Sequence, residues 1–154
     1  MIIRLSGSHA PSEDTSSLDP SLTSGTSIEL FYYREDLDTD ETGNILCSGD
    51  AVQSVTRHIS DYSIDKHLQT LLAWPNDQEQ AQWFSSEFPL SWFTLQEVEL
   101  DDQGLLSLVF EDREHRSTGW SCRVGILANQ LVKTAETISG VQEIHISPED
   151  IFQP

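Results

Sequence analysis

Residues 119–147, GWSCRVGILANQLVKTAETISGVQEIHIS, contain the clearest structural pattern in the chain. After Ser121, apolar residues recur at spacings of three and four, which is the period of one face of an α-helix. Ser121 is placed to cap the start of this helix, and Gly140 follows its expected end. Residues 141–147 are predicted to form a strand. The apolar helix face consists of Val124, Leu127, Ala128, Leu131, Ala135 and Ile138.

The preceding residues supply the other elements of the domain. Residues 28–33 (IELFYY) and 51–57 (AVQSVTR) predict strands, and residues 63–74 predict a helix that Asp61 or Ser63 caps and Pro75 ends. Residues 93–100 and 105–111 flank the turn sequence DDQG, so they predict a β-hairpin in which Gly104 supplies a positive φ. The order is β-β-α-β-β-α-β. It predicts an α/β (α+β) fold, a two-layer sandwich in which two helices pack on one face of a mainly antiparallel sheet.

Residues 1–27 are predicted to be a flexible linker or tail, and residues 28–154 the folded domain. The segment 6–27 is rich in Ser, Thr, Gly, Pro and Asp and has almost nothing to bury. Such leaders are typical of proteins tethered to a membrane. We therefore expect an extracytoplasmic protein, either secreted or tethered as a lipoprotein through a segment before residue 1.

The charge balance limits the partners of this chain. It has 26 Asp and Glu against 8 Lys and Arg, a formal net charge of -18. Such a chain repels phosphate backbones and anionic lipid, so we do not expect it to bind nucleic acid. The acidity fits either a solvated surface adapted to salt or a face that binds cations or basic proteins.

The order of these landmarks resembles the GerMN domain family. IELFYY is similar to the opening strand of the family, SVTRHI to its strand ending in Arg, and IDKHLQTLLAWPNDQEQAQWFSSEFP to its first helix and Pro corner. GWSCRVGILANQLVKTAETISGVQEIHIS is similar to its Cys-containing helix start, long helix and last strand, and EDIFQP to its ending. The sequence departs from the family at AWP, where Gly is usual before Pro, and at SPED after the final strand.

The resemblance implies a non-enzymatic module for protein interaction or assembly in the bacterial cell envelope, of the kind found in sporulation and germination proteins. Its partners would be other envelope proteins. No catalytic residues are attributed to the family, so the resemblance implies neither a catalytic residue nor a cofactor. A small-ligand or Ca²⁺-binding module is the alternative.

The two cysteines, Cys47 and Cys122, match positions that are Cys in many family members. The resemblance implies a disulfide between them, which an oxidising compartment would favour. Two free thiols, or a Cys122 nucleophile activated by a helix N-terminus and Arg123, are the alternatives. No spacing selects a histidine as the base for such a nucleophile. His58 and His67 are also too far apart for a zinc site on one helix turn.

Two further segments suggest binding sites. Asp36, Asp38 and Asp40 alternate like the start of a calcium loop, but Glu41 replaces the required Gly at position six, so a hydrated acidic loop is the preferred interpretation. Aromatic residues are dense in segment 83–93, where they are either core or an exposed contact patch. The patch candidates are Trp83, Phe84, Phe88, Trp92 and Phe93.

Overall fold

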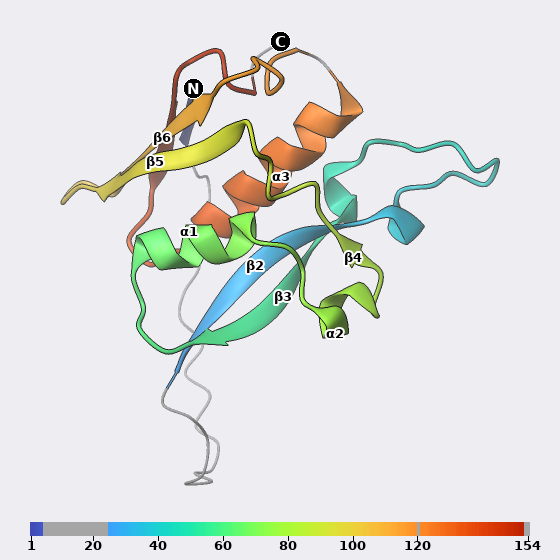
Figure 1. Cartoon of the computed structure of the whole chain (residues 1–154), viewed down its shortest axis with the longest axis horizontal. Helices are drawn as coiled ribbons and strands as arrows, with labels where there is room; N and C mark the ends of the chain where they lie inside the picture. The colour runs from blue at the N-terminus through green and yellow to red at the C-terminus, as the bar shows by residue number, and fades with distance from the viewer. Residues whose placement is uncertain (5–24, 120, 153–154) are drawn as a thin grey trace, which may run out of the picture.

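The protein has an α+β fold built from two β-sheets and the helices between them (Figure 1). A computed structural model describes residues 1–4, 25–119 and 121–152. The predicted fold class and the mostly antiparallel pairing are confirmed. Among the described residues, no helix is long and apolar enough to cross a membrane.

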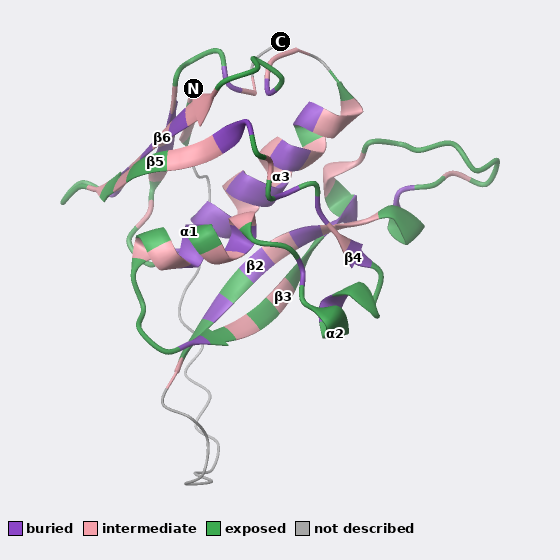
Figure 2. Ribbon diagram, in the orientation of Figure 1, coloured by how far each residue is buried: buried purple, intermediate pink, exposed green. Residues whose placement is uncertain are grey.

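The first sheet has the strand order β3-β2-β4. β2 (Thr26–Arg34) pairs antiparallel with both β3 (Val52–Ile59) and the two-residue β4 (Phe84–Ser85). Ile28, Leu30 and Tyr32 are buried while the residues between them are more exposed, so β2 shows the period of two expected for a strand with one face on the core. Figure 2 shows this alternation along β2 and the more exposed character of β3.

The second sheet has the order β1-β7-β6-β5. β5 (Phe93–Leu100) and β6 (Leu105–Asp112) form the predicted hairpin, and β7 (Glu143–Ser147) lies parallel to β6. Gly104 has φ +86° in the turn, and a Cβ there would lie 2.7 Å from the carbonyl oxygen of Gly140. This turn therefore requires glycine both for its backbone conformation and for its space.

The helices begin and end close to their predicted limits. α1 (Ile64–Leu72) is capped by Ser63 and α3 (Cys122–Glu136) by Ser121, each through a hydroxyl that accepts a backbone N–H. α2 (Asp77–Gln80) is a further single turn, and the 3₁₀ turns are Glu35–Leu37 and Gly49–Ala51. α1 and α3 lie between the sheets in Figure 1, and side chains from both sheets and both helices form one buried cluster.

The predicted arrangement of two helices on one face of a single sheet is wrong, because the strands divide between two sheets and α1 and α3 lie between them. The second edge of β2 is occupied by side chains of the helices. The Phe31 amide donates to the Thr134 hydroxyl at 2.9 Å, and the Glu29 carbonyl lies 2.9 Å from Nε2 of His67. These contacts take the backbone groups that a strand of the other sheet would need, so only the last two residues of β2 pair with β4.

The predicted domain boundary at residue 28 also differs from the structure. β1 (Ile2–Arg4) pairs antiparallel with β7, so the first residues belong to the second sheet, and β2 begins at Thr26. A run of three apolar or basic residues has no period to detect, which is why the sequence did not indicate this strand. The linker prediction for residues 5–24 falls outside the described residues and stays a prediction.

Candidate functional site

A disulfide joins Cys47 to Cys122, with 5.1 Å between the two Cα atoms. It ties the long loop after β2 to the first residue of α3, and Cys47 reaches it with a φ of +57°. The disulfide prediction is confirmed. The alternatives of free thiols and a Cys122 nucleophile are contradicted, because a bonded sulfur offers no thiolate.

The loop before Cys47 uses its carboxylates to hold its own backbone. Asp38 is fully buried and accepts hydrogen bonds from the Tyr33 hydroxyl and the Ser48 amide, both at 2.7 Å. Asp36 forms an ion pair with Arg34 at 2.6 Å. These two carboxylates are therefore engaged with different protein donors and do not converge on one point.

Asp40 organises the tip of the same loop. Its carboxylate accepts from the side chains and backbone amides of Thr42 and Asn44, and these hydrogen bonds hold the pKa of Asp40 well below its usual range. Within the described part of the chain, no group of three or more His, Cys, Asp or Glu is placed to hold a metal ion. The weak calcium candidate of Asp36, Asp38 and Asp40 thus gains no support.

The predicted aromatic patch is mostly core. Phe84, Phe88, Trp92 and Phe93 are buried, whereas Trp83 is 72% exposed. Phe93 stacks on the ring of Phe110 with 4.5 Å between centroids, because β5 begins there and directs this side chain to the core. A contact patch of all five residues is therefore wrong, and Trp83 alone keeps that potential.

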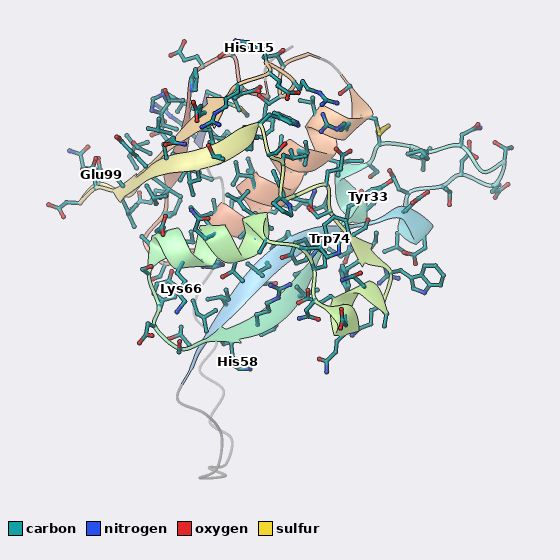
Figure 3. The ribbon with its side chains drawn as sticks, in the orientation of Figure 1. Tyr33, His58, Lys66, Trp74, Glu99 and His115 are labelled. Carbon is teal, nitrogen blue, oxygen red and sulfur yellow. A yellow bond between two sulfur atoms is a disulfide. The ribbon has the colours of Figure 1, made fainter. Side chains whose placement is uncertain are left out.

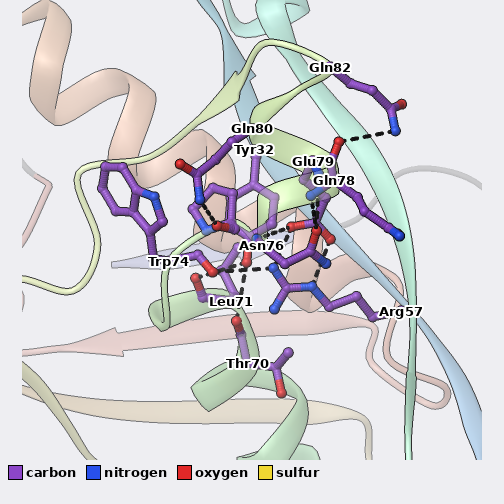
Figure 4. Close-up of polar contacts among 11 residues, drawn as sticks. Tyr32, Arg57, Thr70, Leu71, Trp74, Asn76, Gln78, Glu79, Gln80 and Gln82 are labelled. Carbon is purple, nitrogen blue, oxygen red and sulfur yellow. Dashed lines mark hydrogen bonds and ion pairs between the residues drawn. The ribbon is translucent and has the colours of Figure 1, made fainter.

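A polar network joins β3 to α2 (Figure 4). Arg57 donates from Nε to Oε1 of Glu79 at 2.7 Å and from Nη2 to the other carboxylate oxygen, which makes the pair bidentate. The hydrogen bonds from Arg57 to Glu79 raise the pKa of the guanidinium. The side chains of Arg57 and Glu79 are only 17% and 8% exposed, so this is a largely desolvated ion pair.

Each partner of this pair has a second task. Glu79 accepts the backbone N–H of Asn76 at 2.8 Å and completes a capping box at the start of α2. Arg57 lies over the ring of Tyr32, 5.6 Å from its centroid, and donates to the Trp74 carbonyl at 3.2 Å. Burial raises the pKa of Tyr32 well above its usual range. The network thus fixes the segment between α1 and α2 against the first sheet.

A polar depression of about 380 Å³ lies beside this network. Residues 54–56 of β3 form one wall, and the side chains of the α2 region, including the amides of Asn76, Gln78 and Gln82, form another. Two exposed tryptophans bracket α2: Trp74 is 48% exposed and Trp83 is 72% exposed. We call β3 residues 54–58, the depression and these two tryptophans the β3 surface. Exposed aromatic side chains beside polar groups are typical of contact sites.

Two buried polar side chains have atoms without a hydrogen-bond partner among the described residues. Both amide atoms of Gln130 are unpaired, and this fully buried residue borders a pocket of about 200 Å³ between α3 and residues 85–87. His67 leaves Nδ1 unpaired beside a larger pocket of about 470 Å³. Burial lowers the pKa of His67. These atoms are therefore free to form hydrogen bonds with a bound molecule.

One solved structure reproduces this architecture. The tandem GerMN domains of the sporulation protein GerM from Bacillus subtilis superpose with a TM-score of 0.58 over 92% of this chain, at 13% sequence identity. The fold is that of a GerMN domain. The chain spans 45% of that tandem structure. No protein-family model and no curated protein sequence matches the chain.

Sequence reasoning missed the β3 surface of this GerMN-like domain. Its one local signal was the pattern Asn76 to Glu79, an N-cap residue followed three positions later by Glu, which predicts a helix start. Nothing in the sequence indicated that Glu79 binds Arg57, 22 positions away. Only the placement of α2 over β3 brings the two side chains together.

Proposed function

We propose that this GerMN-like domain is a non-catalytic interaction module of an extracytoplasmic, envelope-associated assembly. The observation that carries the proposal is the likeness to the tandem domains of a sporulation protein, over nearly the whole chain. The Cys47–Cys122 disulfide supports an oxidising compartment, because such bonds are rare in the cytosol. Attachment to the membrane as a lipoprotein, or secretion, belongs to the same proposal.

The charge distribution supports a basic partner. Each of the eight Lys and Arg side chains already contacts a carboxylate or a backbone carbonyl, as with Lys133, which donates to Gly49 and Val52. Most of the carboxylates in the described part of the chain form no ion pair, so the molecule offers negative charge outward. A partner with a basic surface would be drawn to it over about 10 Å, the screening length at 0.1 M salt.

Carbodiimide coupling in intact cells tests the proposal, since it links surface carboxylates directly to lysines of a bound partner. We expect discrete adducts of the domain in the envelope fraction, together with cysteines that resist alkylation until a reductant is added. A domain found only in the cytosol, with both cysteines alkylated at once and no adducts, would refute the function. Coupling after brief treatment with high salt is the control, because it should abolish adducts that depend on charge.

Small-ligand binding is a second candidate, and the observation that favours it is the unpaired amide of Gln130. A buried amide that can both donate and accept complements another amide group. N-acetylglucosamine, an amide-bearing cell-wall sugar, is the probe. Saturable shifts of the Gln130 side-chain resonance in an NMR titration would support this function, and their absence at about 10 mM sugar would remove it.

A further inference from the structure

The four outer strands of the two sheets differ in how they are protected from pairing with another chain. β1 and β4 are only three and two residues long. β5 carries a bulge between Leu95 and Glu97, and exposes Glu97 and Glu99. Short length, bulges and charges are the devices by which proteins block an exposed strand edge.

β3 has none of these devices. It runs for eight residues without Pro, Gly or a register shift against β2. Its one charged residue, Arg57, is neutralised by Glu79. No carboxylate lies within residues 52–59, in a chain with 26 of them. Figure 3 shows His58 at the rim of the molecule on the outer side of this strand.

The hydrogen-bond pattern identifies which backbone groups point outward. Phe31 and Glu29 direct their backbone groups away from β3, toward α3 and α1. In an antiparallel pair the bonding direction alternates along the strand, so the even-numbered residues of β2 are the ones bonded to β3. By register, those residues of β2 lie opposite residues 53, 55 and 57. Residues 54, 56 and 58 must therefore present their N–H and C=O groups to the outer edge.

A contact at the start of the strand agrees with this assignment. The carbonyl of Val52, the preceding residue in the outward series, accepts from Nζ of Lys133 at 3.1 Å. Within residues 1–4, 25–119 and 121–152, the backbone groups of Ser54, Thr56 and His58 have no hydrogen-bond partner. A row of alternating donors and acceptors of this kind is complemented by an extended polypeptide backbone.

The charge of the molecule selects the kind of strand that fits. Two copies of the chain would bring together two net charges of -18, so pairing of β3 with itself is opposed by repulsion. The same field attracts a basic segment. Residues 54–56 of this strand also line the depression with its amide side chains, which offers contacts for side chains of an added strand.

We propose that the outer edge of β3 binds an extended, basic segment of a partner protein by antiparallel or parallel strand addition at residues 54–58. This inference rests on the proposed interaction function and specifies its site and the chemistry of the partner. The unprotected edge and the net charge of the molecule carry it, because an open strand edge in a highly acidic protein favours a cationic strand over an acidic one.

The test uses two synthetic nine-residue peptides with the whole chain labelled with ¹⁵N. The basic probe alternates Val and Thr with two Lys, and the matched probe has Glu in place of each Lys. We expect the basic peptide to shift the amide resonances of Ser54, Thr56 and His58 and to slow their hydrogen exchange, with a Kd below about 2 mM at low salt. The acidic peptide should bind at least about tenfold more weakly.

Variants at Thr56 separate strand addition from other modes of binding. Thr56→Pro removes an outward N–H without removing a bond to β2, so it should weaken the basic peptide about tenfold or more. Thr56→Ala keeps the N–H and is the matched control, expected to bind like the wild type. Thr56→Lys keeps the fold, places a charge on the edge, and should also weaken the basic peptide.

Equal binding to the Pro and Ala variants, shifts confined to other surfaces, or no binding at about 2 mM would overturn strand addition. Binding of residues 5–24 of the same chain to this edge would also overturn it, and would appear as slow exchange of the three amides before any peptide is added. If carbodiimide coupling captures a partner while the peptides fail, only strand addition is lost. If coupling also finds none, the interaction function itself is lost.

Discussion

At the scale of single residues, the carboxylate of Glu79 accepts hydrogen bonds from two neighbours, the guanidinium of Arg57 and the backbone amide of Asn76, the N-cap of α2. Glu79→Gln keeps an acceptor for the helix start but leaves Arg57 without its counter-charge. Because the pair is largely desolvated, we expect a loss of about 2–4 kcal/mol in the free energy of unfolding, measured by urea denaturation.

The control for this substitution is Glu111→Gln. Glu111 pairs with Arg113 on the surface, where their side chains are 44% and 65% exposed, and exposed pairs contribute little. We expect this variant to lose less than about 1 kcal/mol. Equal losses from the two variants would contradict the assignment of the Arg57–Glu79 pair as a structural centre.

His67 makes the stability of the domain depend on pH. Burial lowers its pKa in the folded protein below the value of about 6.5 of an unfolded chain. The unfolded state therefore binds more protons in the window below pH 6.5, and the contribution of neutral His67 is lost as pH falls through that window toward the folded pKa.

His67→Gln keeps an N–H donor for the Glu29 carbonyl but cannot titrate. We expect the stability difference between the wild type and this variant to shrink as pH falls from about 7 to 5, measured by urea denaturation at each pH. His58→Gln makes the same substitution at an exposed position and is the matched control. A constant difference between the wild type and His67→Gln would contradict this account.

At the scale of elements, the disulfide joins a loop and a helix that are 75 residues apart in sequence. Closing a loop of this length in the unfolded chain stabilises the fold by up to about 4 kcal/mol in the chain-entropy model. The double variant Cys47→Ser, Cys122→Ser should lose about 2–4 kcal/mol in urea denaturation. Reductant should lower the stability of the wild type by the same amount and leave the double variant unchanged.

Loss of the disulfide should also have a local effect on the loop that contains Cys47. Leu46 and Ile45 are exposed, and the loop that holds them is otherwise fixed by Asp38 and Asp40. Without the disulfide we expect faster hydrogen exchange at residues 44–48. We expect little change in the hairpin of β5 and β6, because the disulfide does not join either of its strands. Uniform acceleration across the chain would instead indicate that the bond stabilises only through the unfolded state.

At the scale of the whole molecule, charge repulsion is the main long-range force. Every cationic side chain is already paired or bonded, so the excess carboxylates repel one another without relief. Salt screens this repulsion, and we expect the free energy of unfolding in urea to rise by about 1 kcal/mol or more between 0.05 and 1 M NaCl. A variant with four exposed, unpaired acids neutralised should show a smaller rise; these are Glu41, Glu97, Glu99 and Asp102. A rise that is unchanged in this variant would point to general salting-out effects.

The limits of sequence reasoning follow from the range of the interactions involved. α3, its Ser121 cap, the Ser63 cap of α1 and the Gly104 turn were all predicted correctly. Each depends on residues within a few positions of one another, so periodicity and capping chemistry suffice. The disulfide was also predicted, although it came from a family resemblance and not from any local pattern.

The division into two sheets, the burial of the aromatic segment and the β3 surface depended on the tertiary structure. Thr134 and His67 occupy the edge of β2 only after both helices have packed against it. Likewise, Phe93 is core because it meets Phe110, and the charge of Arg57 is balanced by Glu79 because α2 folds over β3. The sequence by itself determined the elements and their caps, which are local. Which edges are filled and which stay open was decided by contacts between residues far apart in the chain, and these follow no sequence period.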